Sequence, residues 1–320
     1  MENPFGKWHP LCFRPVRQAA PWGGTLLAEF RPDAPDAPEG VSWELTDNCT
    51  VAAGPHEGRT LAELTAEFRS DLIGRRYQPD RPFPIYVRLL DAGRRLPLQV
   101  HPDETAVKNA PDGPLNTKFW YCLSARDGAD IMVGMGSRTT RQQFVQRIGS
   151  PDMRELLQTF PATPGDSYLI PAGRIHSAGP GVLLWEVGQH PCEPLEITPE
   201  SADPAGLPMR AAHFEDRQVA RICREMSPVV ATRRIPLVHH CPYFVVDEIR
   251  LVDYLSDRTD GASFHFFTVI RGQMELVTDG GSVSLPTGGS CLLPAALGAY
   301  RCIAVGAPAA VLRVRMQNLK

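Results

Sequence analysis

Proline is unusually frequent in this chain and limits the secondary structure that the chain can form. The 320 residues include 31 prolines, twice the usual share of about 5%. Because proline breaks helices and has no N–H to donate inside a sheet, it favours short strands separated by turns. The 43% of apolar residues is enough for a full hydrophobic core, which excludes disordered and fibrous architectures. One large domain or two small ones fit this length.

The charge balance and the cysteines indicate what partner and compartment to expect. A net charge of −3 lacks the clustered positive charge that nucleic-acid binding requires, so we expect a small-molecule partner. The first residues contain no apolar signal region, and no run of about 18 apolar residues could cross a membrane. The eight cysteines are scattered without a Cys-x-x-Cys pair, which is typical of reduced thiols. We therefore predict a cytoplasmic protein that binds neither nucleic acid nor membrane.

Hydrophobic periodicity predicts a mainly β chain with few helices. Apolar residues at three- and four-residue spacing predict helices near residues 60–73 and 139–160, the second as a small insertion between strands. From residue 241 onward, short apolar runs alternate with glycine and proline turns, as in a barrel or sandwich. The predicted parts are an N-terminal domain of residues 1–188, a crossing segment of residues 189–240 and a C-terminal domain of residues 241–320.

One pattern occurs in both halves of the chain. In the first half, Gly165-x5-Pro171-x-Gly173-x2-His176 has the form of the second cupin motif, in which a strand delivers a histidine to the interior of a barrel. In the second half, Gly288-x5-Pro294 repeats the opening of this motif, but Ala299 stands at the histidine position. The repeat predicts a double cupin, built of two β-barrels or jelly rolls, whose second barrel lacks the ligand.

Gln99-Val100-His101 is the strongest local candidate for metal binding. Residues two apart on a strand point to the same face, so Gln99 and His101 can contact one metal ion. His176 can join them from a neighbouring strand. A single histidine near a turn is usually a surface or capping residue. Their combination within a cupin pattern predicts a metal site.

The segment Leu96–Glu104 resembles the L-S-V-Q-V-H-P-D-D segment of type I mannose-6-phosphate isomerases in their short bacterial form. The similarity extends over nearly the whole chain, through Trp22–Gly24, Ser42–Asp47, Phe83–Ala92, Gly165–Gly181, Cys241–Phe244 and Leu293–Gly298. The resemblance implies a double-cupin enzyme of carbohydrate metabolism, an aldose-ketose isomerase that interconverts mannose 6-phosphate and fructose 6-phosphate.

The resemblance also implies a zinc site, with one departure. The family holds zinc with Gln, His, Glu and His, and Gln99, His101 and His176 stand at three of these positions. The family glutamate is replaced by Lys118. A protonated ammonium group cannot ligate zinc and repels it.

Other positions that the family uses also differ. Asn116 replaces a family lysine, Pro97 replaces a serine associated with the substrate phosphate, and Glu196 stands at the position of an arginine implicated in catalysis. Arg88, at another family lysine position, keeps its positive charge. Arg88 and Asn116 are therefore the candidates for substrate binding.

Two of these departures, Lys118 and Glu196, are consistent with one coupled exchange of charges. The chain has four lysines against 29 arginines, so a lysine at a ligand position stands out. We hypothesise that Lys118 forms an ion pair with Glu196 in place of the metal-centred arrangement, and that zinc binds weakly or not at all. The alternative interpretation of Lys118 is a solvated surface lysine.

Three functions remain open from the sequence. The first is an active isomerase in which three neutral ligands hold zinc. The second is a non-catalytic cupin that binds a sugar or sugar phosphate at a metal-free site. The third is an altered enzyme that uses Lys118 as a base or Schiff-base nucleophile. An acidic partner for Lys118 argues against the third, because it keeps the ammonium group protonated.

Overall fold

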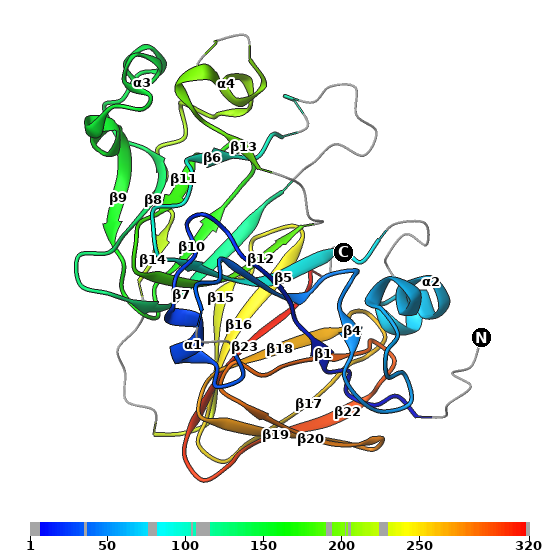
Figure 1. The fold of residues 1–320 in the computed structure, drawn as a ribbon. Coiled ribbons are helices and arrows are strands. Elements are labelled where there is room, and N and C mark those ends of the chain that lie inside the picture. Colours follow the sequence, from blue (N-terminus) through cyan, green and yellow to red (C-terminus); the bar gives the residue numbers. More distant parts are fainter. Residues whose placement is uncertain are drawn as a thin grey trace. The chain divides into compact units, whose positions relative to one another are not determined.

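The computed structural model shows a chain of short strands with a few short helices (Figure 1). It describes residues 7–34, 37–75, 82–103, 105–106, 116–189, 194–201, 203, 206–223 and 230–317. The contacts divide the chain into two compact units. We call residues 17–42 and 85–224 the first cupin unit, and residues 1–16, 43–84 and 225–320 the second cupin unit.

Two sheets of the first cupin unit hold the residues that the sequence singled out. The larger sheet has the strand order β14 (Arg221–Ile222), β10 (Ser167–Ile170), β7 (Lys118–Ala125), β12 (Val182–Gln189), β5 (Ile85–Ala92), β3 (Val41–Leu45) and β2 (Val16–Gln18). The smaller sheet has the order β13 (Leu195–Glu196), β6 (Gln99–Val100), β11 (His176–Ala178), β8 (Asp130–Met135) and β9 (Leu157–Pro161).

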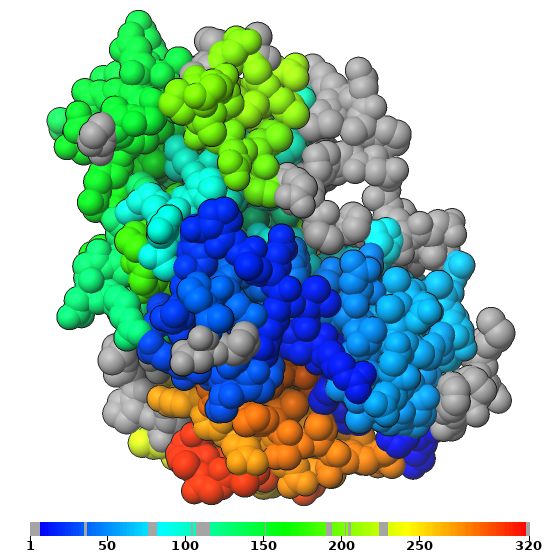
Figure 2. Space-filling model, in the orientation of Figure 1, coloured from blue at the N-terminus to red at the C-terminus, as the bar shows by residue number. Residues whose placement is uncertain are grey.

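The helices of the first cupin unit are short. They are α1 (Leu26–Phe30), α3 (Arg141–Arg147), α4 (Leu207–Ala211) and the 3-10 helices η1 (Pro151–Leu156) and η2 (Pro199–Ser201). Phe144 of α3 and Met209 of α4 belong to one buried apolar cluster. The cluster also contains Val100 of β6 and Ile175, the residue before β11. Figure 2 shows α3 in green and α4 in yellow-green side by side on the surface.

The predicted helix at residues 139–160 is wrong in extent. Thr140 caps α3 through a reciprocal capping box with Gln143, as a helix start requires. The helix then ends at Arg147, because Gly149 adopts a left-handed φ of 79° and Pro151 opens a separate 3-10 helix. Residues from Leu157 onward form β9, which pairs with β8.

The second cupin unit also contains two larger sheets. One has the order β15 (Arg233–Val238), β16 (Phe244–Leu251), β23 (Ala309–Met316), β18 (His265–Arg271) and β21 (Ser290–Leu293). The other has the order β17 (Tyr254–Arg258), β22 (Ala299–Ala304), β19 (Gln273–Thr278) and β20 (Gly281–Pro286). A two-stranded sheet of β1 (Phe13–Arg14) and β4 (Thr50–Val51) and the helix α2 (Leu61–Leu72) complete the unit.

The compact units do not follow the contiguous boundaries that the sequence predicted. Helix α2 lies within the expected range 60–73 but belongs to the second cupin unit, because the amides of Ala295 and Phe264 bond to the carbonyls of Leu72 and Ile73. The predicted crossing segment 189–240 is likewise divided. Its strands β13 and β14 pair within the sheets of the first cupin unit, whereas β15 pairs with β16 in the second.

The two units share one topology. The strand order β3-β5-β12-β7-β10 corresponds to β15-β16-β23-β18-β21, and β6-β11-β8-β9 corresponds to β17-β22-β19-β20. The prediction of a mainly β double cupin is therefore confirmed. The described strands of each unit form facing pairs of open sheets rather than a closed barrel.

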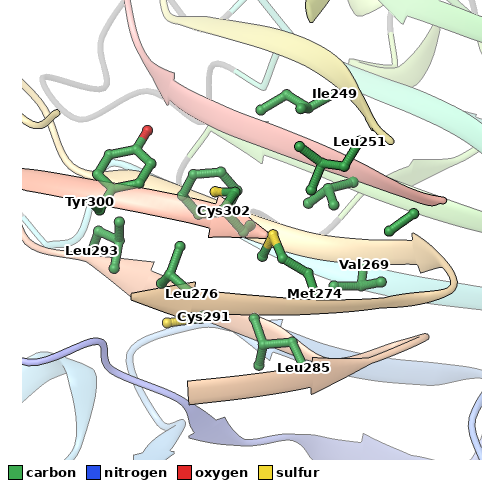
Figure 3. Close-up of a cluster of buried hydrophobic side chains, with 13 residues drawn as sticks. Ile249, Leu251, Val269, Met274, Leu276, Leu285, Cys291, Leu293, Tyr300 and Cys302 are labelled. Carbon is green, nitrogen blue, oxygen red and sulfur yellow. The ribbon is translucent and has the colours of Figure 1, made fainter. Parts of the chain in front are cut away.

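The core of the second cupin unit lies between its two larger sheets (Figure 3). Ile249 of β16 and Val269 of β18 pack in one cluster with Met274 and Leu276 of β19 and Cys302 of β22. Alternate residues of both sheets point inward, as the two-residue period of a strand requires. This explains why short alternating apolar runs dominate the sequence after residue 241.

Two further predictions concern membranes and thiols. In the described part of the chain, no helix is long and apolar enough to span a membrane. The seven described cysteines are free thiols, and five of them are buried. Cys192 lies outside the described residues. The cytoplasmic location stays a prediction.

Candidate functional site

Three short strands of the smaller sheet place Gln99, His176 and Glu196 in one row. Gln99 of β6 pairs with His176 of β11 on one side and with Glu196 of β13 on the other. Directly paired residues of neighbouring strands point to the same face of a sheet. The three side chains therefore share a face, on which His176 is buried, Gln99 is half-buried and Glu196 is exposed.

The two histidines predicted from the sequence meet as a stacked pair. The rings of His101 and His176 are nearly parallel, at 10°, with their centroids 5.6 Å apart. The Nδ1 atom of His176 lies 2.8 Å from the carbonyl oxygen of Arg174. Since a carbonyl only accepts, Nδ1 carries the proton and donates it, which leaves Nε2 as the basic nitrogen. That Nε2 atom is buried and has no hydrogen-bond partner among the described residues.

The larger sheet contributes the opposite wall of the site. The indole of Trp120 on β7 packs edge-on against His176, with the centroids 5.2 Å apart. On either side of β12, Glu186 pairs with Trp120 of β7 and with Arg88 of β5. This register brings a carboxylate, an indole and a guanidinium together in the interior of the unit.

Glu186 is the centre of the charged network at this wall. Its side chain is fully buried and accepts hydrogen bonds from the Tyr86 hydroxyl at 2.8 Å, from Arg88 Nε at 2.6 Å and from the indole of Trp120. The Nζ atom of Lys118 lies 3.4 Å from its Oε2 atom. Burial alone raises the pKa of a carboxyl group, but Arg88, Lys118 and the hydrogen bonds outweigh it and hold the pKa of Glu186 well below its usual range.

Lys118 is paired differently from our expectation. Its side chain is 1% exposed, so the interpretation as a solvated surface lysine is wrong. Its ion pair is formed with Glu186 rather than with Glu196. The strand order explains the difference, because β7 lies beside β12, whereas the exposed Glu196 is on the edge strand of the other sheet.

The two predicted substrate-binding residues are engaged with the same network. Asn116 is buried and donates to the Tyr86 hydroxyl at 3.3 Å. The guanidinium of Arg88 lies over the Tyr86 ring, 5.2 Å from its centroid, in addition to its bond with Glu186. Sequence reasoning did not assign Tyr86 or Glu186. A signal existed, since Arg88 is flanked by apolar residues in β5, Glu186 is the single charge of β12, and a buried charge requires a partner.

The electrostatics keep both histidines neutral. Burial and, next, the ammonium group of Lys118 lower the pKa of His176 to about 3 and the pKa of His101 far below its usual value. Neutral imidazoles and the amide oxygen of Gln99 are donors that a metal ion accepts. The structure therefore brings the three predicted positions together as neutral donors.

A zinc ion does not fit this set of residues. A catalytic zinc site requires three protein ligands and an open fourth position. Here the ammonium group of Lys118 is close enough to both histidines to lower their pKa. The positive charge of this group repels a zinc ion bound to the histidines. Among the described residues, no group of three or more His, Cys, Asp or Glu is placed to hold a metal ion.

The sequence is similar to known proteins. A family profile for the cupin domain of mannose-6-phosphate isomerase matches residues 235–306. The probable mannose-6-phosphate isomerase GmuF of Bacillus subtilis (strain 168) is 33% identical over 188 residues, which cover 57% of this chain and 58% of GmuF. The match thus spans less than two thirds of that relative. The mannose-6-phosphate isomerase ManA of the same organism is 28% identical over 313 residues, which cover 91% of this chain and 95% of ManA.

Solved structures share the fold. The mannose 6-phosphate isomerase of Bacillus subtilis superimposes with a TM-score of 0.79 at 24% identity, over 96% of this chain and 99% of that one. A mannose 6-phosphate isomerase bound with zinc and yttrium superimposes with a TM-score of 0.76 at 15% identity, over 96% and 99% of the two chains. At these identities the likeness establishes the fold.

Proposed function

Because the chain is similar to mannose-6-phosphate isomerases over most of its length, we propose that its first cupin unit binds a hexose phosphate without a catalytic zinc ion. The observation that carries the proposal is the buried ion pair of Lys118 and Glu186. Lys118 stands at the position where the family has a carboxylate ligand. The carboxylate of Glu186 pairs with its ammonium group inside the site.

The protonation states argue against isomerisation in the present arrangement. Moving a proton between adjacent carbons requires a base whose pKa lies near the working pH. The pKa of Glu186 is far below that range, because the charges of Arg88 and Lys118 and the hydrogen bonds from Trp120 and Tyr86 outweigh the effect of burial. The pKa of His176, at about 3, is also too low for an efficient base at pH 7. Neither group is tuned to take up a proton.

Binding of a sugar is compatible with the same residues. Gln99 and Glu196 share one face of the smaller sheet, Gln99 half-buried and Glu196 exposed, so their oxygens can accept hydrogen bonds from hydroxyl groups. A hexose phosphate agrees with the family and with the small-molecule partner predicted from the charge balance. We place this function in the cytoplasm, in agreement with the free thiols.

A zinc-dependent isomerase is the second candidate. The stacked pair of His101 and His176, beside Gln99, favours it, because these neutral donors lie together. Zinc binding there must overcome repulsion by the ammonium group of Lys118, whose charge acts on both histidines.

Metal analysis, a binding titration and an activity assay on the purified chain test the proposal together. We expect far less than one zinc ion per chain after growth in zinc-supplemented medium, saturable calorimetric binding of mannose 6-phosphate, and no conversion to fructose 6-phosphate. Stoichiometric zinc with turnover would establish the second candidate instead. Absence of mannose 6-phosphate binding at millimolar concentration would refute the binding function.

Two substitutions of Lys118 sharpen this test. Lys118→Glu restores the family carboxylate, and we expect it to bind zinc and to unfold at a higher temperature when zinc is added. Lys118→Met removes the same charge without adding a ligand, and we expect no zinc-dependent stabilisation. Equal responses of the two variants to zinc would show that the ammonium group does not decide metal binding.

A further inference from the structure

The second cupin unit has its own counterpart of each candidate-site position. The repeated motif aligns Ile170 with Leu293, and these residues pair with Lys118 and His265 on the neighbouring strands β7 and β18. His265 therefore occupies the position that corresponds to Lys118. His265 is buried, and its Nδ1 atom lies 2.7 Å from the hydroxyl of Tyr300.

The buried ion pair is repeated with its charges reversed. In the first unit, Glu186 pairs in register with Trp120 and Arg88. Phe267 lies two residues after His265 on β18 and pairs with Arg313 of β23. On its other side, Arg313 pairs with Asp247 of β16. Arg313 thus takes the place of Glu186.

The metal-ligand positions are replaced in the same way. In the first unit, Gln99 pairs with His176, and at the corresponding place Arg258 pairs with Ala299. Two residues further along, Asp260 corresponds to His101. The second unit therefore has a guanidinium where the first has the amide donor, and Ala299 has no ligand atom.

A cavity of about 170 Å³ lies at this place, open to solvent. Four arginines line it. Arg234 of β15 and Arg258 of β17 are exposed, whereas on β23 Arg315 is half-buried and Arg313 is buried. Asp257, Asp260 and His265 also line it. A liquid water molecule takes about 30 Å³, so the cavity has room for roughly five or six waters, which suits a small oxyanion.

The guanidinium groups are not fully neutralised by the carboxylates around them. Arg313 is 1% exposed and binds Asp247 at 2.5 Å and Asp257 at 2.6 Å, but its buried Nε atom has no hydrogen-bond partner among the described residues. Neither Arg258 nor Arg315 forms an ion pair within the described ranges. Arg234 reaches only Asp257, at 3.8 Å.

The local charges confirm that positive charge is in excess. Burial and, next, the charge of Arg313 lower the pKa of Arg315, and burial and Arg313 lower the pKa of His265 to about 3. The Asp260 carboxylate accepts the amide N–H of Ala262 at 2.9 Å, so it is engaged with the backbone. Arginine is the side chain that matches phosphate oxygens with paired N–H donors.

We propose that this cavity of the second cupin unit is an anion site that binds a phosphate group, either free or carried by a small metabolite. Arg258 and Arg315 supply guanidinium groups that form no ion pair among the described residues, and the Nε atom of Arg313 supplies a buried donor. The site is separate from the hexose-phosphate function proposed for the first unit, and each can exist without the other.

Calorimetric titration of the full chain with inorganic phosphate tests the proposal. We expect saturable binding in the wild-type chain, at least tenfold weaker binding in Arg258→Gln, and no measurable binding in the double variant of Arg258→Gln and Arg315→Gln. Arg301→Gln is the matched control, because Arg301 is exposed on β22 over the Tyr254 ring and does not line the cavity. We expect its phosphate affinity to stay within twofold of wild type.

Two further measurements separate the possible outcomes. Glycerol 3-phosphate that binds more tightly than inorganic phosphate indicates a phosphorylated metabolite, and equal or weaker binding indicates free phosphate. Mannose 6-phosphate binding to the double variant reports on the first unit independently. Absence of phosphate saturation in the wild-type chain, or equal phosphate affinity in wild type and in a folded Arg258→Gln variant, overturns the proposal.

Discussion

The two cupin units hold a buried ion pair at equivalent strand positions, but with the charges reversed. In the first unit the central strand carries Glu186 and its neighbour carries Arg88. In the second unit the central strand carries Arg313 and its neighbour carries Asp247. The strand order around each pair is the same, so the reversal is one of side-chain chemistry.

This reversal explains what stands next to each pair. The carboxylate of Glu186 stabilises an ammonium group, and Lys118 lies beside it. The guanidinium of Arg313 repels a proton, and the residue at the corresponding position is a neutral histidine, His265. The same strand order can thus place a buried lysine beside a carboxylate in one unit and a neutral histidine near a guanidinium in the other.

Glu186→Gln is expected to have the largest effect on this comparison. The substitution removes the carboxylate that pairs with Arg88 and Lys118 in the interior, and breaking a buried pair in this way costs about 3–5 kcal/mol. Urea unfolding measures the loss. The exposed Glu196→Gln is the matched control and should change the free energy of unfolding by less than about 0.5 kcal/mol. Equal losses in the two variants contradict a central role for Glu186.

Asp247→Asn makes the corresponding change in the second unit, with a smaller expected loss of about 2–3 kcal/mol. The loss is smaller because Arg313 keeps its second carboxylate, Asp257. Urea unfolding again measures it, with the exposed Asp279→Asn as control. A loss larger than that of Glu186→Gln shows that the second pair is the more isolated of the two.

Lys118→Met tests how much of the first network depends on the ammonium group. Glu186 keeps its bonds from Arg88, Tyr86 and Trp120, so we expect a loss of about 1–2 kcal/mol in the free energy of unfolding. A variant more stable than wild type shows that burying the ammonium group costs more than its ion pair returns.

His265 gives the second unit a pH dependence with a defined sign. Its pKa is about 3 in the folded chain, so below the unfolded value of about 6.5 only the unfolded state takes up a proton. Stability from this group is present above pH 6.5 and is lost as the pH falls toward 3. Between pH 6.5 and 5.5 the loss is about 1 kcal/mol.

Unfolding titrations of wild type and His265→Gln at these two pH values measure that difference. The exposed His240→Gln is the control and should keep the wild-type slope. A His265→Gln variant with the full wild-type slope excludes His265 as its source.

Local patterns made much of the fold predictable. The repeated motif begins with Gly165 and Gly288, which adopt left-handed φ angles of 95° and 81° that favour glycine. Both turns lead into strands with the same place in their sheets, β10 and β21. The boundaries between the units were harder to predict, because they depend on long-range pairing, such as that of Leu72 with Ala295.

The sequence predicted the residues of the candidate site that could bind a metal, but not the ion pair beside them. Strand alternation and the cupin pattern were enough to group Gln99, His101 and His176. The predicted partner of Lys118 is wrong because spacing along the chain contains no information on which strands become neighbours. Glu186 reaches Lys118 only because β12 lies between β5 and β7.

The sequence by itself therefore determined a mainly β double cupin, the repeat within it and the neutral donors of its first site, since all of these follow from spacing along the chain. The tertiary structure decided which charges meet, at Lys118 and Glu186 in one unit and at Arg313 and Asp247 in the other. The physical reason is that a buried charge is stabilised by whatever lies across the neighbouring strand, and strand order is a property of the folded sheet.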